Sequence, residues 1–157
     1  MRVPDVGKGS WASSFGTARS MRGNKRRDTQ PEIKIRKLLH ASGLRYRIDY
    51  SLQPGIRTKA DIVFTRRRVA VYIDGCFWHG CPQHATYPKT NTEYWLPKLA
   101  RNIERDRQTD AALQACGWTV IRIWEHVLPS DAAVLIARAV ASSPAASDEI
   151  STSKHAP

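Results

Sequence analysis

A segment rich in cysteine, histidine and aromatic residues spans positions 75–84 and reads GCFWHGCPQH. Within it, Cys76, Cys81 and His84 follow a C-x4-C-x2-H spacing, which lets three soft or borderline ligands converge on one ion from an irregular loop. Zinc is the ion that such a set of sulfur and nitrogen ligands favours. The spacing therefore predicts a zinc site, and simple burial of the two cysteines is the alternative.

A closed structural zinc site needs a fourth protein ligand. We expect this ligand to be His126, which directly follows a predicted strand over 118–124 and so lies at the end of an element. Cys116 is the alternative. It lies at the Ala/Cys/Gly end of a predicted helix, where an unligated cysteine is more often a small core residue.

His79 lies between the two cysteines, yet four other side chains already suffice for a tetrahedral zinc. A neutral imidazole beside a charged metal site is well suited to take a proton as a general base near neutral pH. His79 is therefore our candidate general base. In the alternative interpretation, His79 is itself a zinc ligand in place of His84 or His126.

Two aspartates lie in a predicted β-hairpin whose strands span 60–65 and 69–74, joined by an Arg-Arg-Arg turn at 66–68. Asp61 and Asp74 are at opposite ends of this hairpin, so antiparallel pairing predicts side chains that lie across from each other. Two such carboxylates repel unless a cation lies between them, and Mg²⁺ fits because it prefers oxygen ligands. Asp61 is the stronger candidate since its neighbours are apolar, whereas Asp74 is as well explained by an ion pair with an arginine.

Two more carboxylates have weaker claims on the sequence alone. Asp106 belongs to the segment NIERDR at 102–107, which is by default a solvated helix face, although Asp106 could turn inward and orient a histidine. Glu32 already has a structural explanation, because TQPE at 29–32 reads as a capping box with Thr29 as its N-cap.

Phe77 and Trp78 neighbour the predicted zinc ligands, and core packing is the commoner role for aromatic side chains. Exposed beside a basic surface, such side chains can instead wedge between base pairs and kink a duplex. Met21, in the N-terminal segment, could do the same from the other groove. The residues alone leave both interpretations open.

A regular alternation of helices and strands must position these side chains. The pattern predicts a helix of about 12 residues that starts near Thr29 and stops at Gly43, a strand at 44–52, the hairpin strands at 60–65 and 69–74, a helix at 92–115, a strand at 118–124 and a helix at 130–141. A chain of 157 residues suits one domain. We therefore expect a single α/β domain with a central mixed β-sheet and helices on both faces.

The charge balance points to a polyanionic partner. Lys and Arg number 25 against 14 Asp and Glu, which gives a formal net charge of +11. Nucleic acid is favoured over a membrane, because no stretch approaches the roughly 18 apolar residues of a spanning helix and the basic residues are dispersed. The N-terminal segment has no apolar core of a secretory signal, so we expect a cytoplasmic protein.

Taken together, several motifs resemble the very-short-patch-repair (Vsr) endonuclease family, whose fold belongs to the PD-(D/E)XK, or restriction-endonuclease-like, group. The resemblance runs from about Ser20 to Val127. Its pieces are SMR (20–22), TQPE (29–32), KADIVF (59–64), DGCFWHGCP (74–82), TEYW (92–95), NIERDR (102–107) and GWTVIRIWEH (117–126). It implies an endonuclease domain over 20–141, and the polar composition of the two ends predicts a flexible basic arm over 1–19 and a disordered C-terminal tail over 142–157.

The resemblance also implies roles. Asp61 matches the metal-binding aspartate, and the main-chain carbonyl of Ile73 should supply another contact to Mg²⁺, with Asp74 as a further candidate ligand. The catalytic residues would be Asp61, His79, its carboxylate partner Asp106, and Glu32. The zinc positions would be Cys76, Cys81, His84 and His126, and the intercalating residues Met21, Phe77 and Trp78. The lysine of the superfamily signature is missing, so the histidine would take over its work.

The function that follows is a Mg²⁺-dependent DNA endonuclease of very short patch repair, with a structural Zn²⁺. It would nick one strand on the 5′ side of the mispaired T in a T:G mismatch that arises when 5-methylcytosine deaminates. Double-stranded DNA, mismatch-repair proteins and a cytosine-5 DNA methyltransferase are the expected partners, and we expect a nucleoid-associated monomer. Two alternatives stay open: a restriction-type or branch-specific nuclease of the same fold, and a non-enzymatic zinc DNA-binding module.

Overall fold

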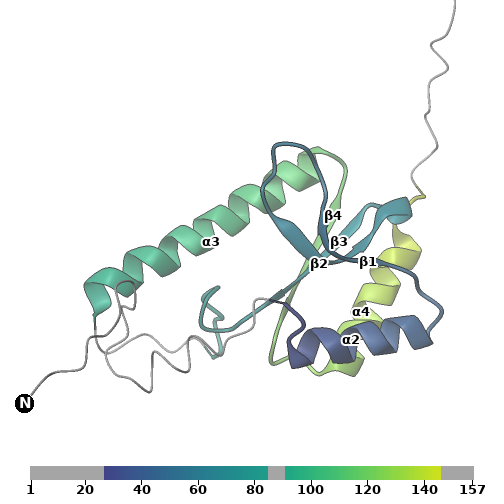
Figure 1. The fold of residues 1–157 in the computed structure, drawn as a ribbon, viewed down its shortest axis with the longest axis horizontal. Helices are drawn as coiled ribbons and strands as arrows, with labels where there is room; N and C mark the ends of the chain where they lie inside the picture. The colour runs from purple at the N-terminus through teal and green to yellow at the C-terminus, as the bar shows by residue number, and fades with distance from the viewer. Residues whose placement is uncertain (1–26, 85–90, 146–157) are drawn as a thin grey trace, which may run out of the picture.

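A four-stranded mixed β-sheet forms the centre of the molecule (Figure 1). The computed structural model describes residues 27–84 and 91–145. The strands lie in the order β1-β2-β3-β4, where β1 is Arg47–Ser51, β2 is Lys59–Phe64, β3 is Val69–Asp74 and β4 is Thr119–Trp124. The first three strands pair antiparallel, and β4 pairs with β3 in parallel. The predicted mixed sheet is confirmed.

Helices cover both faces of this sheet, as predicted (Figure 1). The helix α3 (Thr92–Ala115) lies on one face, where its Leu113 packs against β2 and β3 in a core that also contains Val63 and Ala70. The helices α2 (Gln30–Ala41) and α4 (Pro129–Ser142) pack against each other on the opposite face. There Ile35, Leu39 and Ile136 join a second core with β2, β3 and β4.

The β2–β3 hairpin is the most deeply buried part of the sheet. Ile62, Val63, Val69, Ala70 and Val71 have exposed fractions of 0%. Their β-branched and small side chains suit a pleated surface that is covered on both sides. The burial on both faces that the near-continuous apolar run predicted is thereby confirmed.

Strand β1 begins at Arg47, three residues later than the predicted strand. Leu44 and Tyr46 pack against the α2–α4 core instead of extending the sheet. In the middle of β1, Asp49 has a φ of +48°, in the left-handed region that aspartate tolerates better than most residues. Lys59 and Arg27 form ion pairs with its carboxylate, at 3.3 Å and 3.2 Å.

The start of α2 differs from the predicted capping box. Glu32 accepts a hydrogen bond from the main-chain N–H of Asp28 at 2.8 Å, and the Thr29 hydroxyl donates to the other carboxylate oxygen at 2.8 Å. The hydroxyl of Thr29 caps no main-chain N–H of the helix. The predicted capping box was therefore wrong, because the Thr29 hydroxyl donates to the Glu32 carboxylate instead of accepting a main-chain N–H of the helix.

The other helix bounds agree closely with the sequence pattern. The helix α3 has the predicted ends, and α4 extends one residue beyond each predicted end. Beyond α4, Ser143 is buried, and its carbonyl accepts a hydrogen bond from Arg67 at 2.9 Å. Among the helices of the described ranges, none is long and apolar enough to span a membrane.

Candidate active site and metal centre

The parallel pairing of β3 and β4 brings the functional segments together. Because parallel strands end at the same edge of a sheet, the loop that follows Asp74 and the residues that follow Trp124 leave the sheet side by side. The main-chain N–H of Glu125 donates to the carbonyl of Asp74 at 2.9 Å and prolongs this pairing. The carboxylate of Glu125 accepts a hydrogen bond from the main-chain N–H of Cys76 at 2.7 Å, which is a second link between the two segments.

Asp61 lies in β2 near this edge, with one carboxylate oxygen bonded to the sheet. Its Oδ2 accepts the main-chain N–H of Ile73 at 2.7 Å. Among the described residues no donor is bonded to Oδ1, so this oxygen is available to water or to an ion. The strand pairs Ile62 with Val71, so Asp61 is level with Tyr72 and not with Asp74 as the sequence pattern suggested.

The electrostatic setting of Asp61 is unfavourable for an isolated carboxylate. Burial, assisted by the negative charges of Glu32, Asp74 and Asp49, raises its pKa from 3.8 to about 6, although the N–H of Ile73 favours the charged form. A cation at Oδ1 would relieve this repulsion. The acidic surroundings of Asp61 therefore fit a divalent metal. Asp49, which is level with Asp61 in the β1–β2 register, is one of these acidic residues, and the sequence pattern did not reveal it.

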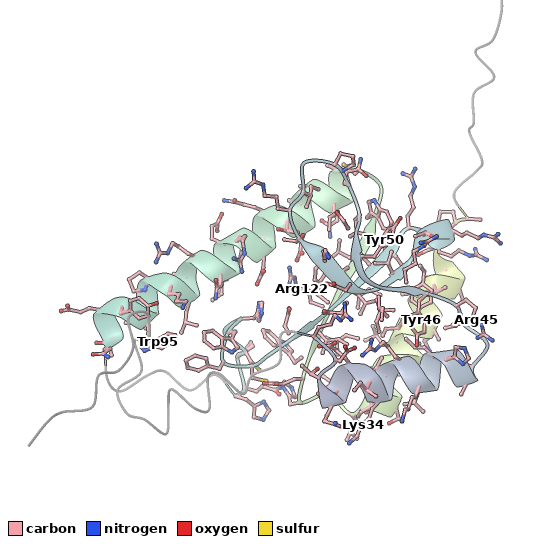
Figure 2. All side chains as sticks on the ribbon, viewed as in Figure 1. Lys34, Arg45, Tyr46, Tyr50, Trp95 and Arg122 are labelled. Carbon is pink, nitrogen blue, oxygen red and sulfur yellow. The ribbon has the colours of Figure 1, made fainter. Side chains whose placement is uncertain are left out.

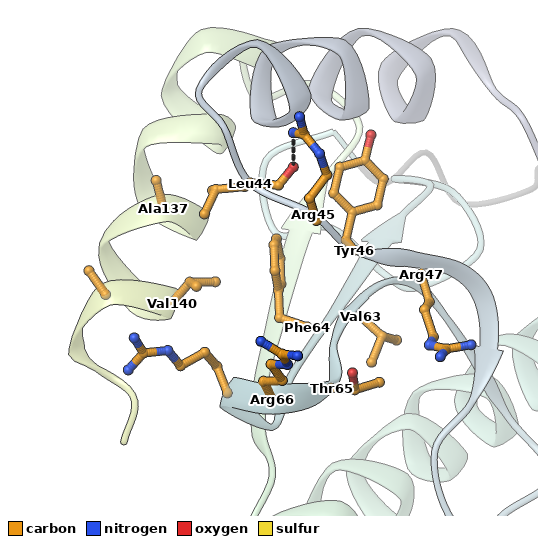
Figure 3. Close-up of a pocket in the computed structure, with 12 residues that line it drawn as sticks. Leu44, Arg45, Tyr46, Arg47, Val63, Phe64, Thr65, Arg66, Ala137 and Val140 are labelled. Carbon is orange, nitrogen blue, oxygen red and sulfur yellow. Dashed lines mark hydrogen bonds between the residues drawn. The ribbon is translucent and has the colours of Figure 1, made fainter. Parts of the chain in front are cut away.

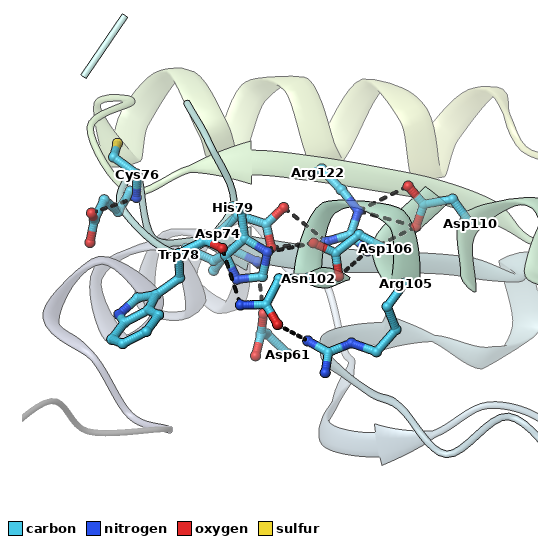
Figure 4. Close-up of polar contacts among 12 residues, drawn as sticks. Asp61, Asp74, Cys76, Trp78, His79, Asn102, Arg105, Asp106, Asp110 and Arg122 are labelled. Atoms are coloured by element: carbon cyan, nitrogen blue, oxygen red, sulfur yellow. Dashed lines mark hydrogen bonds and ion pairs between the residues drawn. The ribbon is translucent and has the colours of Figure 1, made fainter. Parts of the chain in front are cut away.

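His79 meets Asp106 across the gap between the loop and α3. The imidazole Nδ1 lies 2.6 Å from Oδ2 of Asp106 and 3.7 Å from Oδ1 of Asp74 (Figure 4). A carboxylate on Nδ1 selects the tautomer that leaves Nε2 as an acceptor. The predicted inward turn of Asp106 is thus present, and Asp61 lies on the same side of the sheet as His79 in Figure 4.

Asp74 is paired with a guanidinium. Nη1 of Arg122, in β4, lies 3.0 Å and 2.9 Å from the two carboxylate oxygens of Asp74. The same guanidinium binds Asp110 of α3 through Nε and Nη2 (Figure 4). It also lies over the ring of Tyr72. Of the two roles weighed for Asp74, the structure shows the ion pair.

The cluster of Cys76, Cys81, His84 and His126 could hold a metal ion, since one ligand atom from each lies within 4.8 Å of the others. Sγ of Cys76 is 3.1 Å and Sγ of Cys81 is 3.7 Å from Nδ1 of His126, and Sγ of Cys81 is 3.9 Å from Nδ1 of His84. Zinc bonds of 2.0–2.3 Å in a tetrahedron separate ligand atoms by about 3.3–3.8 Å. The donor set and its spacing therefore fit zinc.

The two alternative zinc ligands, His79 and Cys116, both lie outside the Cys/His cluster. His79 is outside this four-residue cluster, and its Nδ1 faces Asp106. Cys116 is at the C-terminal end of α3, where its carbonyl accepts a hydrogen bond from Arg68. Burial, together with the neighbouring sulfur of Cys81, raises the pKa of Cys76 to about 11, so a cation is needed before both sulfurs become thiolates.

The loop that carries His79 reverses direction between Cys76 and Cys81. The main-chain N–H of His79 donates to Gly75 O at 3.3 Å, and that of Cys81 donates to Cys76 O at 3.0 Å. Gly80 has a φ of +69°, and a Cβ there would lie 2.7 Å from Cδ1 of Ile103 on α3. Glycine therefore suits a position where the backbone is left-handed and presses on the helix.

Aromatic side chains gather where this loop meets the start of α3. Phe77, Trp78, Trp95 and Tyr94 form a chain of ring contacts with centroids 5.0–5.9 Å apart. Figure 2 places Trp95 near the first turns of α3. The ammonium group of Lys98 lies 5.1–5.8 Å from the ring centroids of Trp78, Tyr94 and Trp95. Phe77 and Trp78 are partly exposed, and Met21 lies outside the described residues.

One hollow of the molecule lies away from these residues. A cavity of about 660 Å³ lies between the β2–β3 turn, the start of β1 and α4, with Phe64 and Val140 among its apolar walls and Arg45, Arg47 and Arg66 at its rim (Figure 3). It is at the turn end of the hairpin, whereas Asp61 and Asp74 are at the open end. The candidate active site is therefore an open surface of the sheet edge and not this cavity.

The sequence also matches known proteins. Residues 16–85 match the family model described as DNA mismatch endonuclease Vsr. The type II nicking enzyme V.NaeI of Lentzea aerocolonigenes is 50% identical over 123 residues, which cover 77% of this chain and 74% of that protein. The type II nicking enzyme V.XorIIP of Xanthomonas oryzae pv. oryzae is 42% identical over 71% of this chain and 80% of its own length. The DNA mismatch endonuclease Vsr of Escherichia coli is 37% identical over 71% of this chain and 70% of its own. The chain therefore belongs to the Vsr family of DNA mismatch endonucleases and is a DNA endonuclease.

Proposed function

We propose that this endonuclease nicks one DNA strand on the 5′ side of the mispaired T in a T:G mismatch. The observation that carries the proposal is the pairing of His79 with Asp106, outside the Cys/His cluster, next to Asp74, whose charge also acts on Asp61. Such an arrangement offers a base for water and an anionic ligand for a metal at one sheet edge. The similarity to a protein named DNA mismatch endonuclease Vsr supports the choice of substrate.

Asp61 would hold a catalytic Mg²⁺ through its open oxygen, with the main-chain carbonyl of Ile73 as a second contact. When bound, the ion would stabilise negative charge on the scissile phosphate and offset the repulsion around Asp61. Glu32 adds negative charge on this side and is buried. Both oxygens of Asp74 already accept hydrogen bonds from Arg122, so Asp74 would add negative charge near Asp61 and no ligand oxygen.

His79 would take the proton from the attacking water. Its Nδ1–H donates to Asp106, which leaves Nε2 as the proton acceptor and stabilises the imidazolium that forms. The water oxygen bonds to phosphorus while the bond from phosphorus to the leaving ester oxygen breaks, and that oxygen departs as a hydroxyl group after taking a proton from solvent. Proton transfer by a positioned group contributes roughly 10²- to 10⁴-fold to such a step.

Zinc would have a structural role. Cys76, Cys81, His84 and His126 enclose the loop that presents His79, and zinc with four protein ligands leaves no position for water. Holding both ends of this loop fixes the imidazole against α3.

Phe77 and Trp78 would enter the duplex beside the mismatch, with Met21 entering from the other groove. Both aromatic rings are partly exposed, and the ammonium group of Lys98 lies 5.8 Å from the ring centroid of Trp78. Wedging side chains unstack a base step and bend the duplex. The net charge of +11 supplies the general attraction to phosphates.

The biological setting follows from the chemistry of the mismatch. Deamination of 5-methylcytosine leaves T opposite G, so a cytosine-5 DNA methyltransferase is the expected companion, and mismatch-repair proteins are expected partners. The protein would act as a monomer on nucleoid DNA in the cytoplasm. The endonuclease domain would span residues 20–141, between a basic arm at 1–19 and a tail at 142–157.

The test is a strand-specific nicking assay with end-labelled duplexes and Mg²⁺. We expect cutting 5′ of the mispaired T, little cutting of a matched duplex, and none after Asp61→Ala although the variant still binds DNA. Equal cutting of matched or branched duplexes would instead support a restriction-type or branch-specific nuclease. Undetectable nicking by the wild type, with DNA binding retained, would support a zinc DNA-binding module.

A further inference from the structure

The region behind His79 contains a charged group that the proposed chemistry does not use. Arg122 lies in β4, between the sheet and α3, and three carboxylates surround its guanidinium (Figure 2, Figure 4). Asp110 accepts three contacts from Nε and Nη2 at 2.9–3.1 Å, and Asp74 accepts two from Nη1. The ring of Tyr72 lies below, 4.6 Å from the guanidinium carbon.

The same guanidinium reaches the partner of His79. Nη2 of Arg122 is 3.5 Å from Oδ1 of Asp106, while the other oxygen of Asp106 is 2.6 Å from Nδ1 of His79. On the other side, Asp74, which Arg122 also binds, has its Oδ1 3.7 Å from the same Nδ1. The four side chains His79, Asp106, Arg122 and Asp74 therefore form a closed ring.

We propose that Arg122, anchored by Asp110, is the positioning residue that fixes Asp106 against Nδ1 of His79. This inference rests on the proposed function, because it assigns Arg122 an effect on the imidazole that takes the proton from water. Asp110 is the anchor: its three contacts and the ring of Tyr72 prevent the guanidinium from turning away.

Charge explains why an arginine is needed here. Asp74, Asp106 and Asp110 bring three negative charges within 3.5 Å of one guanidinium. Without the guanidinium, these carboxylates would repel one another, and Asp106 would be pushed from its place against His79. A lysine would keep the charge, but one ammonium group cannot reproduce the planar fork that reaches three carboxylates at once.

The experiment measures single-turnover nicking and DNA affinity for the full chain with zinc bound. Arg122→Met should nick about 10- to 100-fold more slowly than wild type, which is the usual effect of losing a group that orients an active-site ligand. Its Kd for the duplex should stay within about twofold of the control Arg138→Met. Arg138 is an exposed residue of α4, so this control removes the same charge from the surface.

A double-mutant cycle separates positioning from a merely structural role. In an Asp106→Asn background, adding Arg122→Met should change the nicking rate by less than about twofold, because the group that Arg122 positions is already impaired. An additional slowing of the full 10- to 100-fold would overturn the proposal. So would an Arg122→Met variant that nicks as fast as Arg138→Met.

A gentler pair of variants covers the case in which Arg122→Met does not fold. The carboxylate of Asp110 accepts hydrogen bonds from Arg122, and among the described residues no hydrogen bond or ion pair joins it to His79 or to the carboxylate of Asp106. Asp110→Asn should slow nicking at least fivefold in the wild-type background and have no effect beside Asp106→Asn, and Arg122→Lys should fall between wild type and Arg122→Met. Unchanged rates in both variants would contradict the proposal.

One readout does not depend on nuclease activity. In protein with ¹⁵N-labelled histidine, the Nδ1–H of His79 bonded to Asp106 should give a protected signal that His79→Asn removes and Arg122→Met weakens. A wild type that fails to nick T:G duplexes would defeat the proposed function while this signal still tests the ring. An unchanged His79 signal in a folded Arg122→Met variant would overturn the positioning role.

Discussion

Replacing Asp61 by asparagine should make the protein more stable while it abolishes nicking. The Asp61 carboxylate is held in a buried, acidic setting, and burial is the largest cause of its raised pKa of about 6. Asparagine has nearly the same shape and can still accept the N–H of Ile73, but it carries no charge to bury. The charge that the chemistry needs is therefore costly to the fold.

The size of the effect follows from the pKa. A carboxyl with a pKa of about 6 in the folded chain and 3.8 in the unfolded chain contributes stability below pH 3.8 and loses it as the pH rises through 6. The loss is about 3 kcal/mol at pH 8 and about 1.6 kcal/mol at pH 5. Asp61→Asn escapes this loss, so its advantage over wild type should grow between those two pH values.

The assay is urea unfolding of zinc-loaded protein without Mg²⁺, at pH 5 and pH 8. For a chain of this size, about 3 kcal/mol corresponds to a rise in Tm of roughly 6–12 °C. The matched control is Glu104→Gln, which removes one exposed negative charge on α3 and can keep the hydrogen bond from Gln108. Added Mg²⁺ should then stabilise the wild type and leave Asp61→Asn unchanged, so the difference between their free energies of unfolding should become smaller.

Two results would refute this reasoning. One is an Asp61→Asn variant that is no more stable than wild type at pH 8, since the carboxylate would then have no burial cost. The other is an advantage of equal size at pH 5 and pH 8, since no titration between pH 3.8 and 6 could then explain it.

Three further predictions concern the loop and its metal. His79→Ala should lower the single-turnover nicking rate by roughly 10²- to 10⁴-fold and keep one zinc per chain, as elemental analysis can check; loss of zinc would mean that His79 is a ligand. Cys81→Ser, or chelation of zinc from the wild type, should lower the Tm and the nicking rate together, and an unchanged Tm would exclude a structural ion. Gly80→Ala should destabilise the fold by about 1–2 kcal/mol in urea unfolding, because its φ of +69° strains any L side chain, and wild-type stability would contradict this.

The sequence predicted best those features that depend on neighbouring residues. The runs of β-branched residues in the hairpin and the long periodic segment of α3 matched the structure closely, because each has one strong local preference. The Cys/His spacing is also local, and His126 joins the cluster only because β4 ends beside β3.

The errors came from competing partners that sequence spacing does not reveal. Thr29 was expected to cap α2, yet the Glu32 carboxylate engages its hydroxyl. Asp74 was expected to face Asp61, but the strand register and the pairing with Arg122, 48 positions away, decide where it lies. Because the chain has 25 lysines and arginines, the sequence alone cannot show which of them forms an ion pair with a given carboxylate.

The central claim is that a metal held by Asp61 acts on the scissile phosphate. A phosphorothioate at the scissile position of a T:G duplex tests it, because sulfur binds Mg²⁺ poorly and accepts softer ions such as Mn²⁺ or Cd²⁺. We predict slow nicking of this substrate in Mg²⁺, recovery in the softer ion for the wild type, and no recovery for Asp61→Asn. Full activity on the phosphorothioate in Mg²⁺, or equal recovery in Asp61→Asn, would contradict the claim.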